Sequence, residues 1–152
     1  MSSLPAERRA ARLAAVQALY QMEAAGATTE TVLEDLSAGR LPRDEAGPLE
    51  AEADRELFRT VIETAVARQR TLDRAIAARL AEGWRLERLD AVARAILRAG
   101  AAELESRADI PVPVVIDEYV EIAKSFFDGP EPAFVNATLD ACARDLRPEE
   151  RA

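Results

Sequence analysis

Apolar residues recur every three or four positions along most of the chain, and this period predicts amphipathic α-helices. The first such stretch spans 7–22 and ends where Gly26 follows two alanines. Its expected buried stripe comprises Leu13, Val16, Leu19 and Tyr20. Comparable stripes predict further helices over 29–36, 55–66, 72–82, 89–104, 113–127 and 134–146. We expect Asp54 to cap the third helix, because a carboxylate there can accept a hydrogen bond from a free backbone N–H.

The connections between these stretches carry helix-breaking residues. Residues 37–53 contain two glycines and two prolines among charged residues, which indicates a mobile loop. Pro111 and Pro113 favour extended backbone before the next helix. No stretch alternates apolar and polar residues convincingly over the length of a strand. The sequence therefore predicts an all-α protein with six or seven helices, in which a loop near Gly83 separates two packed helical halves.

Length and composition are those of one globular domain. The chain has 152 residues, of which 49% are apolar and 32% charged, so it can bury a substantial core. A single cysteine and the absence of histidine exclude an intrachain disulfide, a Cys/His zinc site and histidine acid–base catalysis. No apolar run is long enough to span a bilayer, and no apolar core of a secretory signal follows the N-terminal charges. We therefore expect a cytoplasmic protein without a membrane-spanning segment.

Charge is distributed unevenly along the chain. The net charge is −8, yet residues 1–22 hold three arginines against one glutamate. Arg8, Arg9 and Arg12 thus form a basic tip on an acidic body, which favours a directed contact with an anion such as nucleic acid. The acidic remainder argues against non-specific coating of nucleic acid, because that mode needs many phosphate contacts. A solvated helix end without a ligand accounts for the three arginines equally well.

Five further charged residues each allow two interpretations. Arg98 and Lys124 lie in apolar helices, where a basic side chain is more often a surface residue with a packed stem than a ligand contact. The carboxylates of Asp117, Glu118 and Glu121 could serve acid–base chemistry or hold a metal ion. A solvated helix face is favoured, because no second motif completes such a site.

The segment Phe134-Val135-Asn136 also allows two interpretations. An ordinary helix start, with two apolar residues packed inward, is favoured over an exposed partner surface. Cys142 falls on an apolar helical stripe and is expected in the core. Glycines do not cluster into a phosphate-binding loop. The sequence thus offers no catalytic constellation, and it predicts neither a metal site nor a cofactor.

Four motifs follow one another along the chain. They are AVQALYQ at 15–21, WRLERLDAVARAILR at 84–98, IPVPVVIDEYVEIAKSF at 110–126 and FVNATLD at 134–140. With the arginine-bearing helix start, they resemble the NusB family of bacterial transcription antitermination factors. Each motif alone is modest, but the ordered set covers most of the chain and is specific.

The resemblance implies a seven-helix fold of two packed three-helix halves, here roughly 6–82 and 83–147 of a single RNA-binding domain over 1–152. Family members pair with NusE, which is also a small-subunit ribosomal protein. The heterodimer binds the boxA element of nascent ribosomal RNA as single-stranded RNA and joins the antitermination complex on RNA polymerase. It thereby promotes ribosomal RNA synthesis without enzymatic activity. Some members resemble homodimers and others monomers, so the resemblance allows either state for this chain.

The resemblance also assigns roles to individual residues. It places RNA binding at Arg8, Arg9, Arg12, Gln17, Tyr20, Arg98 and Lys124. It places the surface that faces NusE at Tyr20, Phe134, Val135 and Asn136. The chain departs from the family pattern at Ala10, Ala93 and Ala102, where relatives commonly carry a basic residue, a glutamate and a tyrosine. The basic patch is therefore thinner in this chain.

Two other functions stay open at this point. A NusB-like domain also resembles the N-terminal part of some ribosomal RNA cytosine methyltransferases, but 152 residues leave no room for a cofactor-binding α/β domain. Binding of S-adenosylmethionine would support that function. The other alternative is a helical adaptor without an RNA role, which a titration with boxA RNA distinguishes from an antitermination factor.

Overall fold

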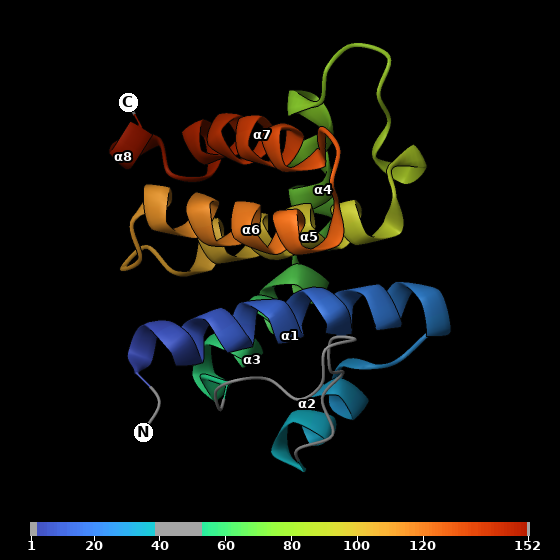
Figure 1. Ribbon diagram of the computed structural model, residues 1–152, viewed down its shortest axis with the longest axis vertical. Helices are drawn as coiled ribbons and strands as arrows, with labels where there is room; N and C mark the ends of the chain where they lie inside the picture. The colour runs from blue at the N-terminus through green and yellow to red at the C-terminus, as the bar shows by residue number, and fades with distance from the viewer. Residues whose placement is uncertain (1–2, 39–52, 152) are drawn as a thin grey trace.

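The computed structural model describes residues 3–38 and 53–151, and every regular element within these ranges is a helix (Figure 1). The long helices are α1 (Leu4–Ala25), α2 (Thr29–Ser37), α3 (Arg55–Ala67), α4 (Gln69–Arg79), α5 (Ala91–Ser106), α6 (Val112–Phe126) and α7 (Glu131–Leu146). A 3-10 helix, η1 (Leu86–Arg88), and a four-residue helix, α8 (Pro148–Arg151), accompany them. The all-α prediction is confirmed. The predicted mobile loop over 37–53 falls mainly on residues 39–52, which lie outside the described residues.

Short polar side chains fix where several helices begin. The predicted N-cap Asp54 is confirmed, since its carboxylate accepts a hydrogen bond from the Leu57 backbone N–H at 3.0 Å. Thr28 caps α2 in the same way. Asp90 caps α5, accepting from the Val92 N–H at 2.8 Å. Each cap satisfies a backbone donor that has no partner inside its own helix.

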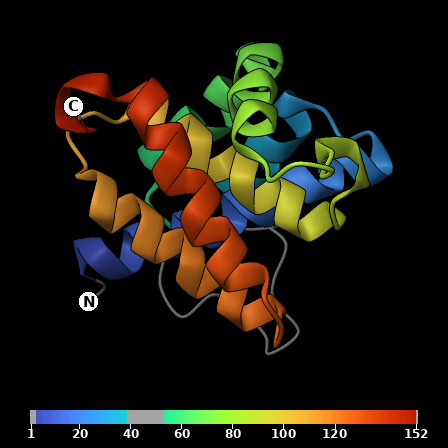
Figure 2. The same cartoon turned by 90° about the horizontal axis from the view of Figure 1, so that it is seen from above.

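Helix α5 lies at the centre of the molecule and contacts α1, α3, α4, α6 and α7. Figure 1 shows α1 to α3 below α5 to α7, and Figure 2 shows α7 lying across α6 and α5. The buried face of α5 is built largely from alanine and Gly100. A Cβ atom at Gly100 would lie 2.8 Å from Cδ1 of Leu139, so a larger residue here would require the Leu139 side chain of α7 to shift.

The small residues of α5 also explain why most of the buried stripe predicted for α1 is wrong. Tyr20, expected in the core, is 38% exposed, and Leu13 and Leu19 are only partly buried. The buried face of α1 instead comprises Ala10, Ala11, Arg12, Ala14, Ala15, Val16 and Ala18. Two alanine-rich helix faces can pack closely, and large side chains are then displaced to the edges of the contact.

The described helices pack as one body. Because α5 contacts helices from both sides of Gly83, the division into halves near this residue stays a prediction. The expected core position of Cys142 is confirmed, since its side chain is fully buried. No helix in the described ranges is long and apolar enough to cross a membrane.

Candidate nucleic-acid interface

The residues predicted to bind RNA on α1 lie on two sides of that helix. By the 3.6-residue period Arg9 and Tyr20 share one side, which is open to solvent, and Gln17 lies at the edge of that side and is partly buried. Arg8 and Arg12 point to another side, toward the rest of the protein. The three arginines of the basic tip therefore have different surroundings, although they are close in sequence.

Arg9 is the most accessible of the three, with 64% of its side chain exposed. Its Nε and Nη2 atoms donate hydrogen bonds to the two carboxylate oxygens of Glu118 on α6, at 3.1 and 3.2 Å. These hydrogen bonds raise the pKa of Arg9. The guanidinium is thus held in an orientation that suits a planar anion, and a phosphate could replace the carboxylate.

Arg8 is less available. Its Nε atom lies 3.9 Å from a carboxylate oxygen of Asp54, and its side chain is 28% exposed. The Nε atom is shielded and finds no hydrogen-bond acceptor among the described residues. Arg8 therefore rests over the start of α3, with part of its guanidinium at the surface.

Arg12 is buried, with 2% of its side chain exposed. Its Nε and Nη2 atoms donate to both carboxylate oxygens of Glu103 on α5, at 2.8 to 3.1 Å. The Tyr119 hydroxyl of α6 donates to the same carboxylate at 2.9 Å. Burial alone would lower the pKa of Arg12, but the hydrogen bonds and charge of Glu103 raise it. The structure gives Arg12 a packing role between three helices, which leaves its side chain no surface to offer RNA.

Arg98 belongs to a second ion-pair network. Its Nε and Nη2 atoms donate to Asp73 of α4 at 2.9 and 3.0 Å, and its Nη1 atom donates to Glu23 of α1 at 2.7 Å. Hydrogen bonds from Arg94 and Arg98 lower the pKa of Glu23. The network lines a groove of about 770 Å³ between α1, α4 and α5. Glu23 lies about 21 Å along α1 from Arg9, so Arg98 does not join the arginines of the basic tip.

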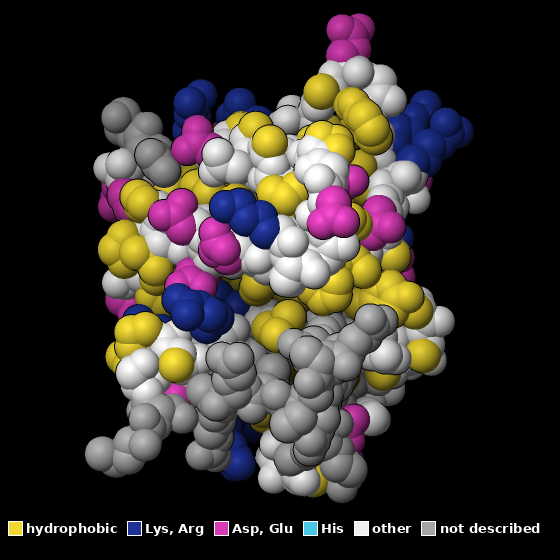
Figure 3. Space-filling view, viewed as in Figure 1, with side chains coloured by type: hydrophobic (Ala, Val, Ile, Leu, Met, Phe, Trp, Pro, Cys, Tyr) yellow, Lys and Arg dark blue, Asp and Glu magenta, His cyan; other side chains and the backbone are white. Residues whose placement is uncertain are grey.

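The remaining predicted RNA contacts are scattered. Lys124 is 58% exposed and donates to Glu121 at 3.0 Å, in the last turns of α6. The side-chain oxygen of Gln17 is shielded and finds no donor among the described residues. Tyr20 is exposed on the same side of α1 as Arg9. On the face of the molecule that Figure 3 shows, basic side chains lie next to acidic ones and do not form one continuous basic patch.

The predicted partner segment at the start of α7 is divided between core and surface. Phe134 is partly buried and Asn136 is exposed. Val135 is fully buried, because it belongs to the apolar stripe that packs in the core. The favoured interpretation of a helix start with inward apolar residues therefore applies to Val135, whose side chain cannot touch a partner.

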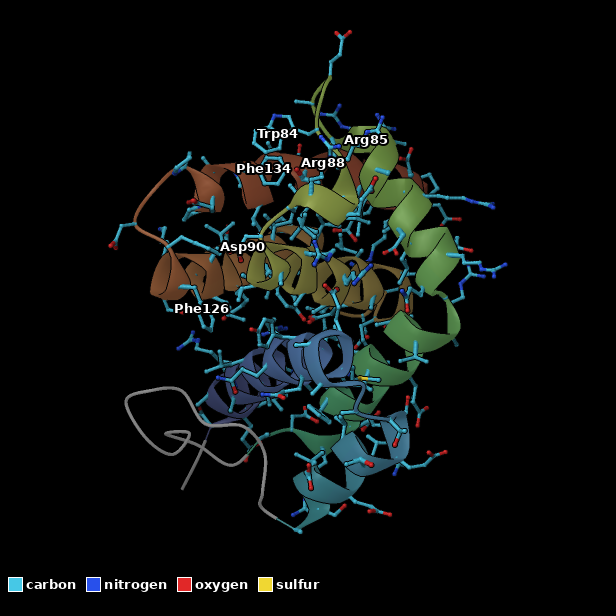
Figure 4. The ribbon with its side chains drawn as sticks, turned by 90° about the vertical axis from the view of Figure 1, so that its right-hand side faces the viewer. Trp84, Arg85, Arg88, Asp90, Phe126 and Phe134 are labelled. Carbon is cyan, nitrogen blue, oxygen red and sulfur yellow. The ribbon has the colours of Figure 1, made fainter. Side chains whose placement is uncertain are left out.

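Two exposed aromatic residues were not identified as site residues from the sequence. Trp84 is 58% exposed and Phe126 is 41% exposed. The Trp84 ring packs on Phe134, with 6.0 Å between ring centroids and 42° between ring planes (Figure 4). One sequence signal was available for Trp84, because it lies in a turn beside charged residues and outside every apolar stripe.

Comparison with known proteins identifies the family. The NusB family model matches residues 9–144. The transcription antitermination proteins NusB of Caulobacter vibrioides and Maricaulis maris are 56% and 51% identical to this chain, over 92% and 94% of it and 94% and 89% of their own lengths. Thermotoga maritima NusB superposes with a TM-score of 0.77 at 34% identity, covering 99% of this chain and 98% of that one.

A solved structure of the antitermination factors NusB and NusE in complex with double-stranded RNA is also similar. It matches with a TM-score of 0.71 at 25% identity, covering 94% of this chain and 99% of that one. Both the sequence relatives and the solved structures align over nearly the full length of the chain. The protein described here belongs to the NusB family.

Proposed function

We propose that this protein is a transcription antitermination factor that pairs with the ribosomal protein NusE and binds the boxA element of nascent ribosomal RNA. The single RNA-binding domain would span 1–152, and the complex would join the antitermination machinery on RNA polymerase. The observation that carries the proposal is the exposed Arg9 at the free end of α1, in a chain of the NusB family. A guanidinium held in this orientation can bind a phosphate through two hydrogen bonds.

Each accessible residue would make a different contact with RNA. Arg9 supplies the main phosphate contact, and the exposed part of the Arg8 guanidinium adds a weaker one. Tyr20 on the same side of α1 and Gln17 at its edge offer an aromatic ring and an amide to unpaired bases. Lys124 contributes charge from α6. Arg12 and Arg98 act indirectly, because their ion pairs fix α1 against its neighbours.

The acidic body fits a role as one half of a composite site. With a net charge of −8, the chain can attract a basic partner that supplies the missing positive surface. Tyr20, Phe134 and Asn136 are the surface residues proposed to face NusE. The protein would act without catalysis, in the cytoplasm, where nascent transcripts are found.

The experiment that tests this function is a titration of labelled boxA RNA with the protein alone and with the protein and NusE. We expect weak, salt-sensitive binding by the protein alone and at least tenfold tighter binding with NusE. RNA affinity that is equally low with and without NusE would contradict the proposal and favour an adaptor without an RNA role. Binding of S-adenosylmethionine, measured by calorimetry, would instead favour the methyltransferase-associated module.

A further inference from the structure

Three of the seven aromatic residues of this protein lie at the surface. Of the seven, only Phe58 and Tyr119 are buried. Tyr20, Trp84 and Phe126 are each more than a third exposed. Tryptophan and tyrosine are enriched at binding surfaces, so an exposed tryptophan is a candidate binding residue.

Trp84 is the most exposed of them, and the backbone holds it in a defined place. Gly83 has a φ of 89°, in the left-handed region that favours glycine, and the Trp84 N–H donates to the Ala81 carbonyl at 3.0 Å. The indole packs against Phe134 of α7, which supports one side of the ring. More than half of the side chain stays open to solvent. The turn therefore presents a supported, flat aromatic surface.

Two arginines lie on one side of this surface (Figure 4). The Arg88 side chain makes no ion pair or hydrogen bond with any residue that the structure describes. Arg85 is 69% exposed, and its contact with Glu87 spans 3.9 Å, the limit of an ion pair. This contrasts with Arg9 and Arg12, which each bind a carboxylate through two nitrogen atoms. The guanidinium groups beside Trp84 are therefore less involved in ion pairs within the protein than those of Arg9 and Arg12.

Nearby carboxylates leave the charge of this turn near zero. Asp90 accepts hydrogen bonds from the first N–H groups of α5 and is used as a cap. Glu82 and Glu87 are exposed and offset the charges of the two arginines. A ligand here would therefore be held more by the aromatic ring than by net charge.

We infer that Trp84, supported by Phe134 and flanked by Arg88, is a stacking platform for an unpaired base of single-stranded RNA. A flat indole face beside a free guanidinium suits a base with its neighbouring phosphate. NusE is the competing occupant, because Phe134, which supports the ring, is itself proposed to face NusE. RNA is favoured here, because charged side chains surround the ring and limit its continuous apolar area. This inference rests on the proposed function and adds a contact outside α1.

The chain offers a direct measurement, because Trp84 is its only tryptophan. Titrating the intact protein and NusE with single-stranded boxA RNA should quench the Trp84 fluorescence at the same RNA concentrations that change the anisotropy of labelled RNA. We expect Trp84→Leu to weaken RNA binding about 5- to 30-fold, because a leucine cannot stack on a base. Trp84→Phe keeps an aromatic face and should stay within about threefold of the wild type. Because Trp84 is exposed, neither variant should alter the circular dichroism spectrum.

The possible results separate the platform from the function on which it rests. Two results together would overturn the platform and leave the proposed function intact: RNA binds the wild type without changing its Trp84 fluorescence, and RNA binds Trp84→Leu with the same affinity. Protection of Trp84 from acrylamide by NusE alone, with weaker NusE binding by Trp84→Leu, would assign the surface to the protein partner and also overturn it. Absence of RNA binding with and without NusE would reject both. If a variant fails to fold, the wild-type fluorescence titration decides.

Discussion

At the scale of single residues, the basic tip of α1 is already neutralised within the protein. Arg9 binds Glu118 through two hydrogen bonds, and Arg8 faces Asp54. An exposed ion pair of this kind stabilises a protein by about 0 to 1 kcal/mol. RNA can therefore displace Glu118 at a small cost, and the carboxylate lowers the affinity of Arg9 for other anions.

This competition predicts that Glu118→Gln raises the affinity of the protein for boxA RNA. We expect a two- to fivefold increase, since about 0.5 to 1 kcal/mol of competing interaction is removed. The increase should be larger at low salt. Glu105→Gln is the matched control, because Glu105 binds Arg68 in the same two-hydrogen-bond arrangement on another part of the surface. Fluorescence anisotropy measures both variants, and a decrease with Glu118→Gln would contradict the competition.

Arg12 illustrates the opposite case, a charge that is fully enclosed. We predict that Arg12→Met destabilises the protein by about 3 to 5 kcal/mol, because it leaves the Glu103 carboxylate buried and unpaired. Adding Glu103→Leu and Tyr119→Phe to the same chain removes the remaining buried polar groups and should restore much of the loss. Urea denaturation measures each variant. A stable Arg12→Met protein with weak RNA binding would instead make Arg12 an RNA contact, as the family resemblance implied.

At the scale of helices, the sequence pattern located the elements well but misjudged some of their faces. The period of apolar residues placed all the long helices, and Asp54 was recognisable as a cap. The orientation of α1 could not be predicted from the sequence, because its buried face depends on the alanines of α5, which are far away in sequence. The partner of Arg12 is 91 residues away, so no local pattern could reveal this buried pair.

Arg147 is a second enclosed arginine, and it connects the end of α7 to the end of α5. Its side chain is 6% exposed and donates to the carbonyl oxygens of Leu104, at 2.6 Å, and of Arg107 and Ile110. These groups lie at or just beyond the last turn of α5, where carbonyls lack partners within the helix. The guanidinium therefore supplies donors to the Leu104 and Ile110 carbonyls and adds a second donor to the Arg107 carbonyl, which also accepts from the Ile110 N–H at 3.0 Å.

We predict that Arg147→Lys destabilises the protein by about 2 to 4 kcal/mol, because one ammonium group cannot reach carbonyls on both sides of the turn. Arg144→Ala is the control, since Arg144 is 63% exposed and pairs only within α7. That change should alter the free energy of unfolding by less than about 0.5 kcal/mol. Equal stability of Arg147→Lys and the wild type in thermal and urea unfolding would show that the carbonyls are satisfied in another way.

At the scale of the whole molecule, candidate RNA contacts lie on two separate parts of the surface. One is the open side of α1 with Arg9, and the other is the turn that carries Trp84. The family could be recognised from four ordered motifs, but the division of its basic residues into accessible and buried ones could not. That division depends on tertiary contacts, such as those that enclose Arg12 and Arg98.

The proposed function depends on Arg9 acting as an RNA contact within a complex with NusE. The most direct test compares boxA RNA binding by NusE complexes of the wild type, Arg9→Ala and Arg59→Ala. Arg59 is the matched control, because it is also 64% exposed and paired with one glutamate, on α3. We predict that Arg9→Ala lowers RNA affinity about tenfold and reduces the slope of log affinity against log salt by about 0.7, the value for one phosphate contact on a single strand. Arg59→Ala should match the wild type, and both variants should bind NusE normally. An unchanged RNA affinity and salt slope for Arg9→Ala would contradict the role assigned to α1.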